Sequence, residues 1–161
     1  MTIALALALC ALACVVAAAI FDLALFEIPD SLSIALVATA IAYGLAVPGF
    51  GWISHIAAPL IVFGIGLFVF SRGWLGGGDV KVMSGIAAWT GLEGLAPQLV
   101  ATSVAGGVLV LVLMGVRRGI AGAGVGSDGM HRLFRSDGPI PYAVAIAVGT
   151  AYWAIEAWPV S

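Results

Sequence analysis

The sequence predicts an all-α, polytopic membrane protein with about six transmembrane helices, and composition is the first observation behind this prediction. Of the 161 residues, 63% are hydrophobic and only 9% are charged, whereas a soluble domain carries roughly 25% charged residues. The second observation is a series of apolar runs long enough to cross a bilayer. The same composition excludes a disordered chain, because disordered chains are rich in charge and poor in apolar residues.

Five apolar runs have about the length that a transmembrane helix needs. They occupy residues 2–21, 31–48, 52–71, 95–115 and 139–158. A sixth run, residues 80–89, is shorter and follows a glycine-rich break, so the fourth helix is expected to be short. Turn-forming residues separate the runs, at 29–31, 48–51, 73–78 and 91–94. Residues 116–138 are expected to form a cytoplasmic loop within a single domain that covers residues 1–161.

The first apolar run ends in small residues, as a secretory signal does. A signal peptide begins with a basic region, but no Lys or Arg precedes Arg72. We therefore expect a retained first helix. Its cysteines, Cys10 and Cys14, form no CxxC pair and have no His/Cys cluster near them in the sequence, so neither a metal site nor a disulfide framework is expected.

Glycine is frequent inside the expected helices as well as between them. Examples are Gly64, Gly66, Gly106 and Gly107. Small residues let membrane helices approach closely, so these glycines are expected at helix contacts.

The distribution of basic residues orients the expected helices, because Lys and Arg mark the cytoplasmic side. With six spans, all the basic residues lie on or beside one face: Arg72, Lys81, Arg117, Arg118, Arg132 and Arg135. Without the short fourth span they would split between the two faces. This asymmetry favours six spans, with both termini outside. The expected location is the cell inner (plasma) membrane. The arginines of the long loop are expected to fix the topology, with anionic lipid headgroups as secondary partners.

Acidic residues at span ends are candidates for function, since ionisable groups at membrane depth are costly. Asp22 directly follows the first span, and Asp79 follows three glycines and opens the fourth. Between the two residues, the second span leaves this face of the membrane and the third span returns to it. Both carboxylates are therefore expected at the same membrane depth. Two carboxylates held together cannot both ionise easily, so one keeps a proton and the other acts as a base. Such a pair can activate water and protonate a leaving amine, as peptide hydrolysis requires.

Both acids also have purely structural interpretations. Asp22 can end a helix at the headgroups, and Asp79 can serve only as a helix N-cap. The three glycines favour a catalytic role, because glycine lets backbone come close to a substrate and permits a moving segment. Lys81 is expected to be an interfacial charge or the partner of an acid.

The adjacent residues Ser54 and His55 suggest a serine hydrolase. Neighbouring residues of a helix do not face each other, however, as a nucleophile and its base must. Helix packing and a local hydrogen bond are therefore expected. Glu93 and Glu156 are expected to meet solvent on the outer face.

The residues around the two acids resemble known motifs. The string Gly76-Gly77-Gly78-Asp79-Val80-Lys81 resembles the GxGD-x-K motif of the type IV prepilin peptidases, which are membrane aspartic proteases. Asp22 followed by Ile28-Pro29-Asp30 is similar to the first motif of that family. Residues 87–91 and 141–146 also resemble family segments, the latter those of the small Tad/Cpa-type branch. Together these cover the chain from residue 22 to about 150 in the family's order.

The resemblance implies that Asp22 and Asp79 form a catalytic dyad. The reaction it implies is removal of the short basic leader of prepilin-like substrates, just before their hydrophobic helix, at the cytoplasmic face. It implies substrate-binding or motif-supporting roles for the surrounding residues: Gly76, Gly77, Gly78, Lys81, Glu27, Pro29 and Asp30. Family members commonly carry basic residues between the first Asp and the Pro, whereas residues 23–27 contain none. Glu27 and Asp30 are placed to attract a basic leader. The chain has no counterpart of the cysteine-bearing domain of larger members, so no methyltransferase activity is expected.

Two function classes follow from these observations. One is a membrane-embedded aspartic endopeptidase, whose partners are the N-terminal segments of prepilins or pseudopilins and membrane lipids. The other is a small transporter or pilus-assembly subunit that uses the same acids as a proton or cation site. Transporters often show interrupted helices in corresponding halves, and the break before Asp79 has no clear counterpart, which favours the peptidase. No cofactor, metal or nucleic acid is expected, given a net charge of −2 without a basic run, and the oligomeric state stays open.

Overall fold

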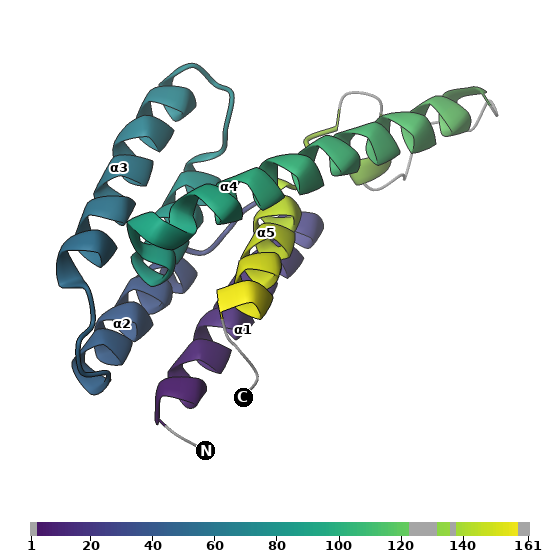
Figure 1. The fold of residues 1–161 in the computed structure, drawn as a ribbon. Coiled ribbons are helices and arrows are strands. Elements are labelled where there is room, and N and C mark those ends of the chain that lie inside the picture. Colours follow the sequence, from purple (N-terminus) through teal and green to yellow (C-terminus); the bar gives the residue numbers. More distant parts are fainter. Residues whose placement is uncertain (1–2, 123–131, 136–137, 158–161) are drawn as a thin grey trace.

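The computed structural model contains only helices in the part of the chain that it describes, residues 3–122, 132–135 and 138–157 (Figure 1). The elements in chain order are α1 (Ile3–Leu25), α2 (Asp30–Ala46), α3 (Trp52–Ser71), α4 (Gly77–Gly122), the 3₁₀ turn η1 (Arg132–Phe134) and α5 (Tyr142–Ala157). The prediction of an all-α fold is confirmed for these residues.

Three of the helices are long and apolar enough to cross a membrane: α1, α3 and the part of α4 from Gly77 to Ile120. The helices α2 and α5 are also apolar but shorter. Large apolar side chains cover the outside of the bundle; Ile53, Leu45 and Ile155, for example, are 86%, 78% and 79% exposed. Such a surface suits lipid rather than water. The chain is therefore a membrane protein with several apolar helices.

Helix α4 is broken at Gly91, within the glycine-rich stretch where the sequence predicts a turn. Gly91 has φ 60° and ψ −174°, values outside the helical region that divide α4 into the segments 77–90 and 92–122. The residues of the expected fourth and fifth spans thus lie in two segments of one broken helix. Only glycine adopts this backbone conformation readily, so the residue type at position 91 makes the break possible.

Several helix ends differ from the prediction. α1 continues to Leu25, so Asp22 lies inside its last turns and not after the helix. α4 continues to Gly122, so the prediction that residues 116–138 form a loop is wrong for 116–122. The prediction followed the end of the apolar run, but Arg is a good helix former and a helix does not stop where its hydropathy falls. Of the remaining expected loop, residues 123–131 and 136–137 lie outside the described residues.

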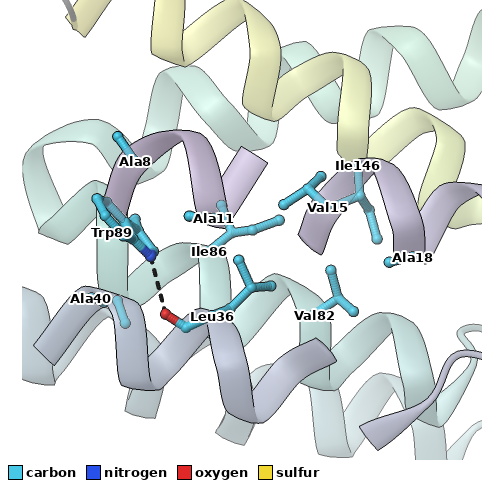
Figure 2. Packing of buried hydrophobic residues seen from close by; sticks show 11 residues of the cluster. Ala8, Ala11, Val15, Ala18, Leu36, Ala40, Val82, Ile86, Trp89 and Ile146 are labelled. Atoms are coloured by element: carbon cyan, nitrogen blue, oxygen red, sulfur yellow. Dashed lines mark hydrogen bonds between the residues drawn. The ribbon is translucent and has the colours of Figure 1, made fainter. Parts of the chain in front are cut away.

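The core is formed by α1, α2, the first segment of α4 and α5 (Figure 2). One face of α1 contributes a row of small side chains, Ala8, Ala11, Val15 and Ala18. Across from this row, the indole nitrogen of Trp89 donates a hydrogen bond to the carbonyl oxygen of Leu36, at 3.0 Å (Figure 2). Because these side chains are small, the four helix segments pack at close range.

The helix glycines divide into two groups. A Cβ atom at Gly66 would lie 2.6 Å from Cγ1 of Val80, and one at Gly106 would lie 3.2 Å from the Tyr142 ring. For these two residues the prediction of close helix contact is confirmed. It is wrong for Gly64 and Gly107, around which a Cβ atom would meet nothing within 4 Å.

Candidate active site

Asp22 is held by the first turn of another helix. Its side chain is only 7% exposed, and its Oδ2 atom accepts a hydrogen bond from the backbone N–H of Ala143, at 2.9 Å. Ala143 is the second residue of α5, where backbone N–H groups have no partner inside the helix and the helix dipole is positive. The N-terminus of α5 is therefore built against a carboxylate from α1.

The chain leaves α1 abruptly after Asp22. The backbone N–H of Phe26 donates to the carbonyl oxygen of Asp22, at 2.9 Å, and Phe26 has φ 54°, in the left-handed region. A left-handed residue at this place ends a helix, at a cost of about 1–2 kcal/mol for a residue other than glycine. Pro29, with φ −60° and ψ 132°, then precedes the first residue of α2, Asp30. Pro29 thus sets the start of α2 close behind the end of α1.

Asp79 lies in the first turn of α4 and is 8% exposed. Its carboxylate accepts a hydrogen bond from the backbone N–H of Gly76, while the Gly76 carbonyl accepts from Val80 N–H at 3.2 Å. This is the acidic half of a capping box, so the carboxylate does satisfy a helix end. Its other oxygen, Oδ1, is buried and has no hydrogen-bond partner in the described part of the chain. One oxygen of Asp79 caps the helix, and the other is left over for another role.

The two acids come together in space. The Asp79 carboxylate interacts electrostatically with that of Asp22, although the second and third helices separate them in the sequence. The start of α4 also packs on the connection that follows Asp22, since a Cβ atom at Gly78 would lie 3.1 Å from Cβ of Ile28. The absence of a side chain at Gly78 therefore allows the segment 76–79 to pack against the segment 28–30.

The three glycines have different neighbours. A Cβ atom at Gly76 would lie 2.8 Å from Oδ2 of Asp79, whereas one at Gly77 would make ordinary contact with the Phe70 ring, at 3.4 Å. Gly76 therefore leaves space for the Asp79 carboxylate itself.

Lys81 forms an ion pair with Asp30, at 2.6 Å between Nζ and Oδ1. The prediction that Lys81 is the partner of an acid is confirmed. Both side chains are exposed, so the pair contributes less than about 1 kcal/mol. The ion pair links the start of α4 to the start of α2 beside the two buried acids. Glu27, in the connection between α1 and α2, is also exposed.

Ser54 and His55 lie elsewhere, at the break in α4. The Ser54 hydroxyl donates to Oε2 of Glu93 at 2.5 Å and accepts from the backbone N–H of Leu92 at 2.8 Å. Nδ1 of His55 lies 2.9 Å from the carbonyl oxygen of Ala88. The two residues thus bond to backbone groups on both sides of Gly91. The prediction of helix packing is confirmed, but the hydrogen bonds join α3 to α4 and are not local.

Glu93 and Glu156, which the sequence predicts on the outer face, are exposed, and each has a hydrogen bond. Glu93 accepts the bond from Ser54, and Glu156 accepts one from the Tyr152 hydroxyl at 2.5 Å. Within the described residues, no group of three or more His, Cys, Asp or Glu side chains is arranged to hold a metal ion. The buried pair Asp22 and Asp79 is therefore the candidate site with the clearest chemistry.

Sequence reasoning missed the backbone donors of the site. Gly76 and Ala143 contribute N–H groups, and a backbone group gives no side-chain signal in a sequence. The segment 141–146 resembles a family segment, but that resemblance does not indicate which atom of it reaches Asp22.

Comparison with known proteins supplies an independent observation. A family model described as the type IV leader peptidase family matches residues 8–111, a range that includes both Asp22 and Asp79. Searches of curated proteins and of solved structures gave no significant match.

Proposed function

The chain belongs to the type IV leader peptidase family and is thus an aspartic-type prepilin peptidase, and from this premise we propose that Asp22 and Asp79 are its two catalytic carboxyl groups. The observation that carries the proposal is their meeting as two buried, electrostatically interacting carboxyl groups from distant parts of the chain. Family membership favours the peptidase over the transporter or assembly subunit that the same acids also suggest.

The chemistry needs one ionised and one protonated carboxyl group. The ionised group takes a proton from water as the water oxygen attacks the carbonyl carbon of the scissile peptide bond. The protonated group then gives its proton to the peptide nitrogen, and the C–N bond breaks. The products are the leader with a new carboxyl group and the prepilin with a new amine. The two acids have exchanged protonation states, and one proton transfer restores the starting state.

The exposed acidic groups beside the dyad suggest how a basic leader is recognised. Asp30 is already neutralised by Lys81, whereas Glu27 is exposed on the α1–α2 connection. We therefore assign Glu27, ahead of Asp30, as the group that attracts the positive charge of the leader. Attraction between exposed charges of this kind weakens as salt is added.

The course of α4 supports six membrane crossings. Its first segment starts beside Asp22, and its break at Gly91 lies near the start of α1, because Leu5 and Gly94 line one cavity of about 940 Å³. The second segment returns toward the start of α5, where Arg117 contacts Pro139. We propose that α4 crosses the membrane twice, in antiparallel segments. All basic residues are then expected on the side of Asp22, which by the positive-inside rule is the cytoplasmic side.

The decisive test is cleavage of a purified prepilin that has a basic leader, with the peptidase in detergent or liposomes. Asp22→Asn and Asp79→Asn are each expected to lower the cleavage rate by at least about a hundredfold, because Asn cannot transfer the proton. Asp30→Asn is the matched control, an exposed acid of the same region, and is expected to stay within a few-fold of the parent. A parental cleavage rate in either dyad variant would falsify the assignment.

A further inference from the structure

Arg117 binds the backbone of the segment that leads into α5. It is half-buried on the second segment of α4. Its Nε atom donates to the carbonyl oxygen of Leu133 at 3.0 Å, and its Nη2 atom donates to that of Pro139 at 2.9 Å. A guanidinium group offers several donors in a fixed plane, so one side chain can hold two carbonyl groups in a defined relation.

Backbone hydrogen bonds join residues that lie next to the two carbonyl groups bound by Arg117. Backbone hydrogen bonds run from Arg135 N–H to Arg132 O, at 3.3 Å, and from Gly138 N–H to Arg135 O, at 3.0 Å. A Cβ atom at Gly138 would collide with the Arg132 carbonyl oxygen. Gly138 therefore lies close to Arg132, beside the Leu133 and Pro139 carbonyls, with no room for a larger residue at position 138.

The connection from this segment to Asp22 is short and stiff. Between the carbonyl of Pro139 and the N–H of Ala143 lie Ile140, Pro141 and Tyr142. Proline fixes its own φ angle, and Pro141 is fully buried. Displacing the Pro139 carbonyl consequently displaces the N–H of Ala143, which donates to Asp22.

We propose that Arg117 is a positioning residue for the peptidase reaction. By holding the Leu133 and Pro139 carbonyls, it keeps the first turn of α5 against the Asp22 carboxylate. The proposal rests on the catalytic role of Asp22 proposed above. It gives Arg117 a role distinct from that of Arg118, the next residue, which is exposed and forms no hydrogen bond or ion pair with the described part of the chain.

The test compares Arg117→Gln with Arg118→Gln in the full-length protein in detergent, with two readouts. The first is hydrogen exchange at the Ala143 amide, which is slow only while that N–H stays bonded to Asp22. The second is steady-state cleavage of a prepilin. Arg117→Gln is expected to speed exchange at Ala143 and to lower kcat about tenfold with KM unchanged, because the leader-facing residues are untouched. Arg118→Gln is expected to match the parent in both readouts.

Arg117→Lys serves as a second variant in case the Gln variant does not fold. Hydrogen exchange at the amides on the buried face of α1 shows whether each variant is folded. Lysine keeps the charge but not the two-pronged geometry, so intermediate exchange and an intermediate kcat are expected. Parental exchange at Ala143 in folded Arg117→Gln, or faster exchange with parental kcat, overturns the proposal. The exchange readout needs no peptidase activity, so it separates a failure of the Arg117 role from a failure of the proposed function.

Discussion

At the scale of single residues, the two carboxylate oxygens of Asp79 have different surroundings. One of its oxygens accepts the Gly76 N–H and thereby closes the start of α4, while the other is buried without a partner among the described residues. A buried oxygen without a hydrogen bond is costly. In the proposed reaction this oxygen is free to bind a water molecule, a proton or a substrate group. The start of α4 thus holds in place the carboxyl group that we propose to be catalytic.

Gly76 provides a test of this arrangement. In Gly76→Ala the new Cβ atom would lie 2.8 Å from Oδ2 of Asp79, so the carboxylate has to move and the cleavage rate is expected to fall about tenfold. The control is Gly77→Ala, where the Cβ atom makes ordinary contact with Phe70, and near-parental cleavage is expected. Both variants are assayed for cleavage and for thermal unfolding by circular dichroism. Equal cleavage rates in the two variants would show that Gly76 does not place Asp79.

At the scale of elements, α3 holds the first segment of α4 at both ends. Near the break, Ser54 and His55 bond to backbone groups on either side of Gly91. Near Asp79, Gly66 of α3 packs directly on Val80. Since Val80 follows Asp79 in the chain, the contact at Gly66 also fixes the position of Asp79 along the axis of α3.

Two glycines of α3 make this packing measurable. Gly66→Ala is expected to lower the free energy of unfolding by about 1–2 kcal/mol, because the added methyl group overlaps Val80. Gly64→Ala adds the same methyl group where nothing lies within 4 Å, so helix propensity is expected to raise that free energy by up to about 1 kcal/mol. Titration of mixed micelles with a denaturing detergent, followed by far-UV circular dichroism, measures both. A loss of stability in both variants would contradict the contact.

At the scale of the whole molecule, the groups of the proposed site lie at one end of the bundle. Asp22, Asp79 and the start of α5 lie at this end. The start of α1, the end of α5 and the break in α4 lie at the other, around the cavity of about 940 Å³. The chain reverses direction between successive helices, so residues that are far apart in the sequence meet at the same end of the bundle. The charged residues therefore differ between the two ends.

Labelling from the two sides of the membrane tests the orientation. In a background with Cys10→Ala and Cys14→Ala, single cysteines are introduced as Glu27→Cys and Pro48→Cys, both exposed sites in connections. A membrane-impermeant maleimide is expected to label position 48 in intact spheroplasts and position 27 only in inverted vesicles, because basic residues mark the cytoplasmic side. Labelling of both positions from the same side would contradict the proposed six crossings.

Much of this architecture is already contained in local sequence patterns. The apolar runs indicate helices because a bilayer demands continuous internal hydrogen bonding, and the break at Gly91 falls in a predicted turn. Helix ends were less predictable: α1 passes Asp22 and α4 passes Arg117 and Arg118. Hydropathy reports where a chain meets lipid, whereas backbone hydrogen bonding decides where a helix stops.

The sequence by itself determined the fold class and the family and indicated the two candidate acids, because composition, periodicity and motif spacing are properties of the residues alone. Only the tertiary structure decided what surrounds those acids. The N–H of Ala143 reaches Asp22 from 121 positions away, and the Arg117 guanidinium holds carbonyls whose own side chains give no hint of it. Backbone donors and acceptors are the same at every residue, so their partners are settled by how the helices pack.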